Sequence, residues 1–237
     1  MAVFPKERAM TATPFDLLIS DCDGVLVDSE VLADRVMLDA LGAYVPRVEL
    51  EQFLAGSFGL TAQEIVQRVQ RQYALDLPPG LCQEIRTRSE ALIAAEVQPI
   101  DGVREALLAL PLPLAVASNS MCESVVASVA RAGLADHVGE RIFSADMVAR
   151  PKPAPDVYLL AANTLGVAPE RCLVIEDSAT GASAALAAGM TVIGFTGAAH
   201  IPAGHAATLR QLGVAAVMEH MRELPQTYAA LARDAAA

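Results

Sequence analysis

The feature that most constrains the fold of this chain is a series of short apolar runs that each stop abruptly at polar residues. Runs that are apolar at every position are typical of strands buried on both faces of a sheet. Stretches with helical spacing separate them, and such alternation predicts an α/β fold, a doubly wound parallel sheet with helices on both faces. The runs are residues 15–20, 114–117, 172–175, 191–195 and 214–217, and the helical stretches include 121–131, 155–165 and 179–188.

The pattern changes between residues 30 and 98, where helical spacing continues without a strand-like run. A capping box from Thr61 to Glu64 precedes apolar residues at helical spacing, and a second helical pattern follows residues 78–80. Polar or Pro/Gly-bearing joints, residues 27–29 and 99–102, flank the segment. We therefore predict a core domain of residues 1–29 and 99–237, with a helical cap domain of residues 30–98 inserted after the first strand.

Composition excludes several functional classes. The 237 residues include 17 Lys and Arg against 28 Asp and Glu, which gives a formal charge of −11. This charge repels a phosphate backbone, and an aromatic content of only 4% leaves few stacking platforms for bases. We expect no nucleic-acid partner.

The chain also lacks the sequence marks of export or membrane insertion. Its four cysteines form no CxxC pair, which suits free thiols in a reducing compartment. The first ten residues are not followed by a signal-peptide run. Residues 178–209 carry no Asp, Glu, Lys or Arg, but their glycines and Pro202 indicate soluble helix, strand and loop. We expect a cytoplasmic monomer without a membrane partner.

Polar side chains follow three of the predicted strands at the point where each strand ends. Ligands of open parallel sheets bind at this edge, so we expect these side chains to converge. Four of them are carboxylates, which need a cation when they lie close together, and oxygen ligands of this kind suit Mg²⁺. The residues are Asp21 and Asp23 after the first strand, Ser118 and Asn119 after the second, and Glu176 and Asp177 after the third.

Lysine is rare in this chain, and one of its two lysines has a restrained position. Lys152 lies between Pro151 and Pro153, and the other lysine is Lys6. Proline on both sides restricts the backbone, so we expect the ammonium group to be aimed at the carboxylates or at an anionic ligand beside them. The hydroxyl of Ser118 is a candidate for holding phosphate oxygens.

These residues form four ordered motifs that resemble those of the haloacid dehalogenase superfamily, in the branch with a helical cap after the first motif. The chain is similar to phosphoglycolate phosphatases and to beta-phosphoglucomutase-like phosphatases of that branch, and the resemblance implies a Rossmann-like core. It extends over residues 15 to 197, and in the cap it concerns helical character only. The motifs are residues 21–29 (DCDGVLVDS), 116–119 (VASN), 150–153 (RPKP) and 174–178 (VIEDS).

The resemblance implies a role for each of these residues. Asp21 would be the nucleophile that accepts the phosphoryl group, and Asp23 would protonate the leaving alcohol and then activate water. Asp21, the Asp23 main-chain carbonyl and Asp177 would hold Mg²⁺, with Glu176 nearby or acting through water. Lys152 and Ser118 would hold the phosphoryl oxygens, and Asn119 would assist in substrate binding.

The function that we predict is a Mg²⁺-dependent phosphatase acting on a small phosphorylated metabolite, either a sugar phosphate or a phosphorylated acid. A sugar phosphomutase shares the same core and acid/base aspartate, but the cap loop of residues 54–59 offers no cation for a second phosphate. A non-catalytic regulator is disfavoured by the intact set of Asp21, Asp23, Lys152 and Asp177. A metal-free dehalogenase would not need Asp23 or the Glu176–Asp177 pair, and the cap has no Schiff-base lysine for phosphonate hydrolysis.

Other candidates are weaker. His200 and His205 lie in a loop with no third metal ligand in view, so we expect loop residues rather than ligands. Asp28 and Ser29 are interpreted either as a turn that opens the first cap helix or as residues of cap movement. The cap residues that would set specificity cannot be ranked; the candidates are Ser57, Phe58, Arg35, Arg68 and Arg86.

Overall fold

A parallel six-stranded sheet forms the centre of the computed structural model, which describes residues 14–54 and 61–234. The strand order is β3-β2-β1-β4-β5-β6, and every pairing is parallel. The predicted α/β fold is therefore confirmed. The strands are β1 (Leu17–Ser20), β2 (Leu114–Ala117), β3 (Ile142–Phe143), β4 (Cys172–Glu176), β5 (Thr191–Phe195) and β6 (Ala216–Met218).

Side chains of β1 alternate between two apolar layers, one on each face of the sheet. Leu18 belongs to the layer under helices α5 (Val103–Leu108), α6 (Cys122–Arg131) and α11 (Leu224–Asp234). Leu17 and Ile19 belong to the opposite layer, under α8 (Asp156–Leu165), α9 (Ala179–Ala187) and α10 (His205–Leu212). Because both faces are covered, β1, β2 and β4 are buried at every position, which explains their continuous apolar sequences.

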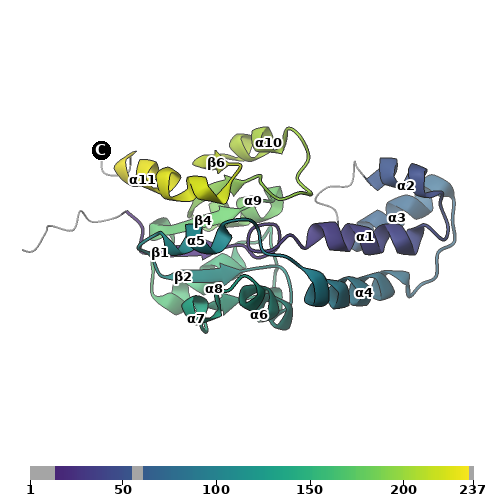
Figure 1. Ribbon diagram of the computed structural model, residues 1–237, viewed down its shortest axis with the longest axis horizontal. Helices are drawn as coiled ribbons and strands as arrows, with labels where there is room; N and C mark the ends of the chain where they lie inside the picture. The colour runs from purple at the N-terminus through teal and green to yellow at the C-terminus, as the bar shows by residue number, and fades with distance from the viewer. Residues whose placement is uncertain (1–13, 55–60, 235–237) are drawn as a thin grey trace, which may run out of the picture.

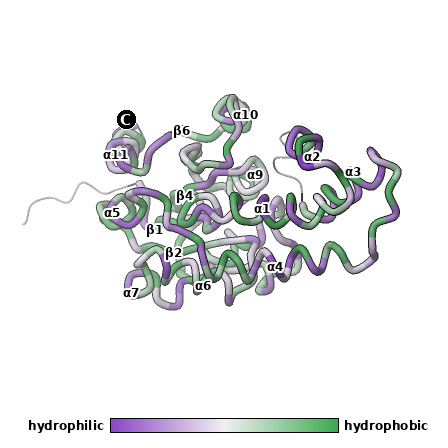
Figure 2. The backbone as a smooth tube through the Cα atoms, turned by 45° about the vertical axis from the view of Figure 1, so that its right-hand side comes forward, coloured by the Kyte–Doolittle hydropathy of each residue, from purple (hydrophilic) through white to green (hydrophobic). Residues whose placement is uncertain are grey.

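Four helices without an intervening strand occupy the chain between β1 and β2. They are α1 (Glu30–Leu41), α2 (Arg47–Leu54), α3 (Ala62–Tyr73) and α4 (Leu81–Glu96). They share their own apolar cluster and extend from one end of the sheet (Figure 1). Hydrophobic and hydrophilic residues alternate along α3 and α4, as expected for helices buried on one side (Figure 2). We call these helices and their connections, residues 30–98, the helical segment; its status as a separate domain stays a prediction.

The predicted start of α3 has the expected local chemistry. The Thr61 hydroxyl accepts a hydrogen bond from the Glu64 main-chain N–H, and the Glu64 carboxylate accepts one from the Thr61 main-chain N–H. These two bonds satisfy donors that a helix start otherwise leaves unpaired.

Short elements were harder to predict than long ones. Strand β3 has only two residues and helix α7 (Ala135–Val138) only four, so neither has enough length for a periodic signal. The uncharged stretch of residues 178–209 contains α9, β5 and the start of α10, as predicted. Within residues 14–54 and 61–234, no helix combines the length and apolar character that crossing a membrane requires.

Truncation of Leu18 tests the central place of β1. Leu18 is fully buried and lies opposite Leu114 of β2 and Leu173 of β4. We expect Leu18→Ala to lower the free energy of unfolding by about 2–5 kcal/mol, because a cavity replaces packed side-chain atoms. Val48→Ala, at a position 66% exposed on α2, should change it by less than about 0.5 kcal/mol. Urea unfolding measures both, and equal effects would contradict this account of the core.

Candidate active site

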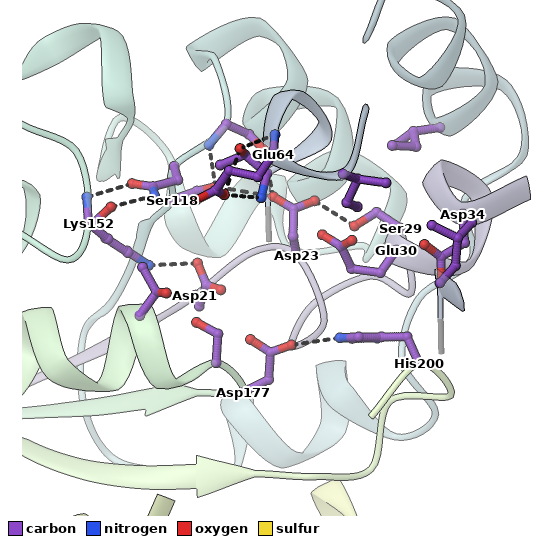
Figure 3. Close-up of a pocket in the computed structure, with 18 of the residues that line it drawn as sticks. Asp21, Asp23, Ser29, Glu30, Asp34, Glu64, Ser118, Lys152, Asp177 and His200 are labelled. Atoms are coloured by element: carbon purple, nitrogen blue, oxygen red, sulfur yellow. Dashed lines mark hydrogen bonds and ion pairs between the residues drawn. The ribbon is translucent and has the colours of Figure 1, made fainter. Parts of the chain in front are cut away.

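The carboxyl ends of β1, β2 and β4 meet at one edge of the sheet because β1 lies between the other two strands. A cavity of about 810 Å³ opens there, between this edge and the helical segment. Figure 3 shows Asp21, Asp23, Ser118, Lys152 and Asp177 around it. Of the seven predicted site residues, six line the cavity, and Glu176 lies fully buried behind them.

Lys152 is the centre of a buried ion cluster. Its Nζ lies 2.8 Å from Asp21 Oδ1 and 2.6 Å from Glu176 Oε1, and it also donates to the Ala117 carbonyl at 2.9 Å. Burial opposes its charge, but the two carboxylates outweigh burial and raise the pKa of Lys152 well above its usual range. Lys152 therefore stays positively charged beside Asp21.

Asn119 fixes the main chain that carries Lys152. The Lys152 N–H donates to Asn119 Oδ1 at 2.8 Å, and Asn119 Nδ2 donates to the Lys152 carbonyl at 3.1 Å. This pair of bonds connects the end of β2 to the loop before α8. Asn119 thus places the lysine by direct contact, in addition to lining the cavity.

Glu176 binds Lys152 on the buried side of the cavity floor. Its Oε1 accepts hydrogen bonds from Lys152 and from the Tyr158 hydroxyl at 2.6 Å, and its Oε2 accepts from the Ser178 hydroxyl at 3.1 Å. The Tyr158 ring also lies 4.7 Å from the Lys152 ammonium group. Both carboxylate oxygens of Glu176 are therefore occupied by donors. Tyr158 could not be predicted as a site residue from the sequence, because it lies inside helix α8 with no motif around it.

Three hydroxyl groups orient Asp23. Ser29 donates to Asp23 Oδ1 at 2.6 Å, while Ser120 and Ser118 donate to Oδ2 at 2.7 and 3.2 Å. Ser29 belongs to the joint before α1, so its contact connects Asp23 to the beginning of the helical segment. Sequence reasoning proposed Ser118 and missed the role of Ser120, whose type and position in a loop are unremarkable.

Two histidines, His200 and His205, contact Asp177. His200 Nε2 lies 3.2 Å from Asp177 Oδ2, and His205 Nε2 lies 2.7 Å from the Asp177 carbonyl oxygen. His200 also lies 3.7 Å from Asp28, measured from Nδ1 to Oδ1. His200 lies in a loop, as expected, whereas His205 is the first residue of α10. Their contacts with Asp177 were not predicted, because they depend on the chain after β5 folding back over the end of β4.

The acidic cluster can accept a metal ion. One carboxylate oxygen from each of Asp21, Glu176 and Asp177 lies within 4.8 Å of the others. Burial, followed by Glu176, raises the pKa of Asp21 well above its usual range, and burial also raises the pKa of Asp177 against the opposing effect of His200. A divalent cation between Asp21 and Asp177 would favour their charged forms, so hard oxygen ligands and charge both fit such an ion.

Gly24 allows the chain after β1 to lie close to the Asp177 carboxylate. Its φ of +76° lets the chain turn directly after Asp23, and a Cβ atom at this position would overlap the Asp177 carboxylate. The first motif therefore needs glycine here for two reasons, the backbone conformation and the space.

The cap residues suggested for specificity have other contacts. Arg35 pairs with Glu96 at 2.7 Å, and Arg68 lies over the Phe53 ring. Arg86 donates to Gln83 and lines a second cavity of about 720 Å³ between α4 and α6. None of these arginines lines the cavity that contains Asp21. Ser57 and Phe58 lie outside the described residues, as does most of the loop of residues 54–59.

Comparison with known proteins shows the family. Residues 15–189 of this doubly wound domain match the haloacid dehalogenase-like hydrolases. The chain belongs to this family.

Relatives and solved structures agree with this assignment. The chain is 32% identical to a fructose-1-phosphate phosphatase of Escherichia coli over 74% of its own length and 94% of the relative's. It is 28% identical to a 6-phosphogluconate phosphatase of the same organism over 76% and 82%. A haloacid dehalogenase-like protein of unknown function from Agrobacterium tumefaciens has 38% identity and a TM-score of 0.85, with 92% of this chain and 99% of that chain covered.

Gly181→Ala tests how tightly Glu176 is enclosed. A Cβ atom at Gly181 would overlap the Glu176 carboxylate, which is fully buried and cannot retreat without releasing Lys152 or Tyr158. We expect a loss of about 1–3 kcal/mol in the free energy of unfolding, as for other overpacked sites. The control, Gly80→Ala, adds its Cβ in open space and should unfold like the unmodified protein. Identical unfolding of Gly181→Ala would show that Glu176 has room to move.

Proposed function

We propose that this protein is a Mg²⁺-dependent phosphatase that hydrolyses phosphate monoesters of small metabolites through an aspartyl phosphate on Asp21. The observation that carries the proposal is the Lys152 ammonium group, 2.8 Å from Asp21 at the floor of a cavity that also contains Asp23 and Asp177. An anionic carboxylate approaches an anionic phosphate only where positive charge lies between them, and Lys152 supplies part of that charge.

Asp21 and Asp23 divide the chemistry. An oxygen of Asp21 attacks phosphorus, a new P–O bond forms, and the bond from phosphorus to the ester oxygen breaks. Asp23, when protonated, gives its proton to the leaving oxygen; as a carboxylate it then takes a proton from the water that hydrolyses the acyl phosphate. The three serine hydroxyls on Asp23 fix its direction for both transfers.

The metal ion fits the acidic end of the cavity. Asp21 and Asp177 would hold it together with the main-chain carbonyl of Asp23, while Glu176, whose oxygens are taken by Lys152, Tyr158 and Ser178, supports the lysine. When bound, such an ion neutralises phosphate charge and polarises the phosphoryl oxygens. His200 and His205 orient Asp177 toward it.

The relatives favour small phosphorylated substrates. Three relatives at 28–32% identity are named as phosphatases of 6-phosphogluconate, fructose 1-phosphate and hexitols. A haloacid dehalogenase family hydrolase from Deinococcus radiodurans, 36% identical with a TM-score of 0.76, was solved with bound phosphate and sodium. We propose that the helical segment acts as the cap that covers such a substrate in the cavity.

The phosphomutase alternative finds no support among the described residues. A mutase has to hold a second phosphate, yet no Lys or Arg of residues 30–54 or 61–98 lines the cavity. A non-catalytic role is disfavoured by the complete arrangement of Asp21, Asp23, Lys152 and Asp177.

Substitution of the two aspartates tests the mechanism. We expect Asp21→Asn to abolish phosphate release, because the amide keeps the shape but does not attack phosphorus. Asp23→Asn should lower kcat by about 10²–10⁴, the usual contribution of general acid/base catalysis. The control is Asp101→Asn, in an exposed turn away from the cavity. Release of inorganic phosphate from a panel of phosphorylated metabolites is the measurement, and an active Asp21→Asn protein would refute the mechanism.

Metal dependence is a separate prediction. EDTA should stop phosphate release, Mg²⁺ should restore it, and Ca²⁺ should restore it poorly because it favours longer bonds and higher coordination numbers. The raised pKa values of Asp21 and Asp177 mean that protons compete with the metal as pH falls. The Mg²⁺ concentration needed for half-maximal rate should therefore increase with decreasing pH. Full activity in EDTA would rule out the metal.

A further inference from the structure

The side of the cavity that faces the core's catalytic residues is acidic. The helical segment contributes four carboxylates to the lining, and among its described residues it contributes no lysine or arginine. The remaining residues of this segment, 55–60, have the sequence AGSFGL, which contains no charged residue. The four are Glu30 and Asp34 of α1, Glu51 of α2 and Glu64 of α3.

Two of these carboxylates have neither an ion pair with a described lysine or arginine nor a hydrogen bond like that of Glu64 to Thr61. Glu51 pairs with Arg47 at 2.9 Å, and Glu64 accepts the hydrogen bonds of Thr61. Glu30 and Asp34 have no such partner, lie one helical turn apart on α1, and are both drawn at the cavity beside Ser29 in Figure 3. Their negative charges therefore act on whatever occupies the cavity.

The protein environment disfavours the charged forms of Glu30 and Asp34, because it raises the pKa of both carboxyl groups. Enclosure in the cavity, followed by the charge of Asp23, raises the pKa of Glu30 to about 7, and enclosure raises the pKa of Asp34 as well; His200 opposes both shifts, and both side chains keep exposed surface. A further anion placed beside them would add to the repulsion, whereas a cation would relieve it.

The positive groups at the cavity are both engaged with the core. Lys152 contacts Asp21 and Glu176, and His200 contacts Asp177 and Asp28. Arg86 and Arg131 line the neighbouring cavity between α4 and α6, where Arg131 donates to the carbonyls of Ala94 and Ala95. A substrate whose phosphoryl group lies at Lys152 and whose body extends toward α1 thus meets carboxylates and uncharged side chains such as Ser29 and Leu38, but no further lysine or arginine of the described residues.

We infer that the site selects phosphate monoesters whose remaining part carries no negative charge, either a neutral polyhydroxyl body or one with an ammonium group. This inference rests on the proposed phosphatase function and narrows its substrates. It excludes phosphorylated acids and bisphosphates, so the substrate named for the 6-phosphogluconate phosphatase relative would be a poor one here, while a neutral ketose phosphate remains suitable.

Two pairs of substrates that differ in charge test the inference. Phosphoethanolamine and phosphoglycolate have two-carbon bodies of opposite charge, and glucose 6-phosphate and 6-phosphogluconate differ by one carboxylate. Near pH 8 with Mg²⁺, we expect kcat/KM to favour the member without the carboxylate by at least about tenfold in each pair. Salt should reduce the preference, because it screens the charges.

Variants of α1 connect the preference to its cause. The double substitution Glu30→Gln and Asp34→Asn should narrow both ratios to within about threefold. The matched control, Glu84→Gln with Glu105→Gln, removes two carboxylates from α4 and α5 that do not line the cavity, and should keep the original ratios.

The outcomes separate the two levels of the proposal. The reporter p-nitrophenyl phosphate has no second charge. If it is hydrolysed, and the acidic member of each pair is used as well as or better than the other member, the inference is overturned but the phosphatase function is not. Ratios that do not change in the α1 variant would also overturn the inference. Failure to release phosphate from the reporter and from all four substrates would overturn the phosphatase function and with it the inference.

Discussion

The contact between the Lys152 ammonium group and the carboxylates of Asp21 and Glu176 is the interaction on which the rest of the site depends. All three groups are almost completely buried, and a buried charge is costly unless it is paired. Removing the lysine would leave two carboxylates facing each other in a poorly solvated place. The surrounding structure is accordingly arranged around this lysine: Asn119 holds its main chain, Tyr158 and Ser178 complete Glu176, and Gly181 leaves space for that carboxylate.

The order of the strands explains why so many polar groups meet there. Since β1 lies between β2 and β4, the three strand ends that carry polar motifs are neighbours at one edge. The apolar layers cover both faces of the sheet, so the polar side chains of these motifs lie beyond the strand ends, at the carboxyl edge. The helical segment follows directly after the first of these motifs, and the bond from Ser29 to Asp23 connects its start to the acid/base candidate.

The sequence predicted this edge well because strand ends have a local signature. A buried run followed by Asp, Ser or Glu indicates both the strand and the position of the polar group, which is why Asp21, Asp23, Ser118 and Asp177 could be proposed together. Lys152 was found through its two flanking prolines. The same reasoning could not predict the contacts of Tyr158, His200 or His205. Each of these residues lies on a helix or loop whose position over the sheet depends on tertiary packing. It also suggested Arg35 and Arg68 as candidate substrate contacts. Side-chain type alone does not show that Arg35 pairs with Glu96 and that Arg68 lies over the Phe53 ring.

Two parts of the cavity have different physical requirements: the floor, with Lys152 and Asp21, and the wall formed by α1, with Glu30 and Asp34. In the proposed mechanism the floor has to combine Lys152 with several carboxylates, because phosphoryl transfer to an aspartate requires positive charge next to negative charge. The wall has no such requirement, since Glu30 and Asp34 lie in the first half of α1, whereas the helix packs through buried residues of its second half, such as Val36, Met37 and Leu41. Charges on the wall can therefore vary without disturbing the floor or the helical core. Under the proposed selection, a chain can keep the chemistry of its family while an acidic turn of α1 determines which phosphate esters enter. The preferred charge of the substrate would then be a property of the helical segment rather than of the fold.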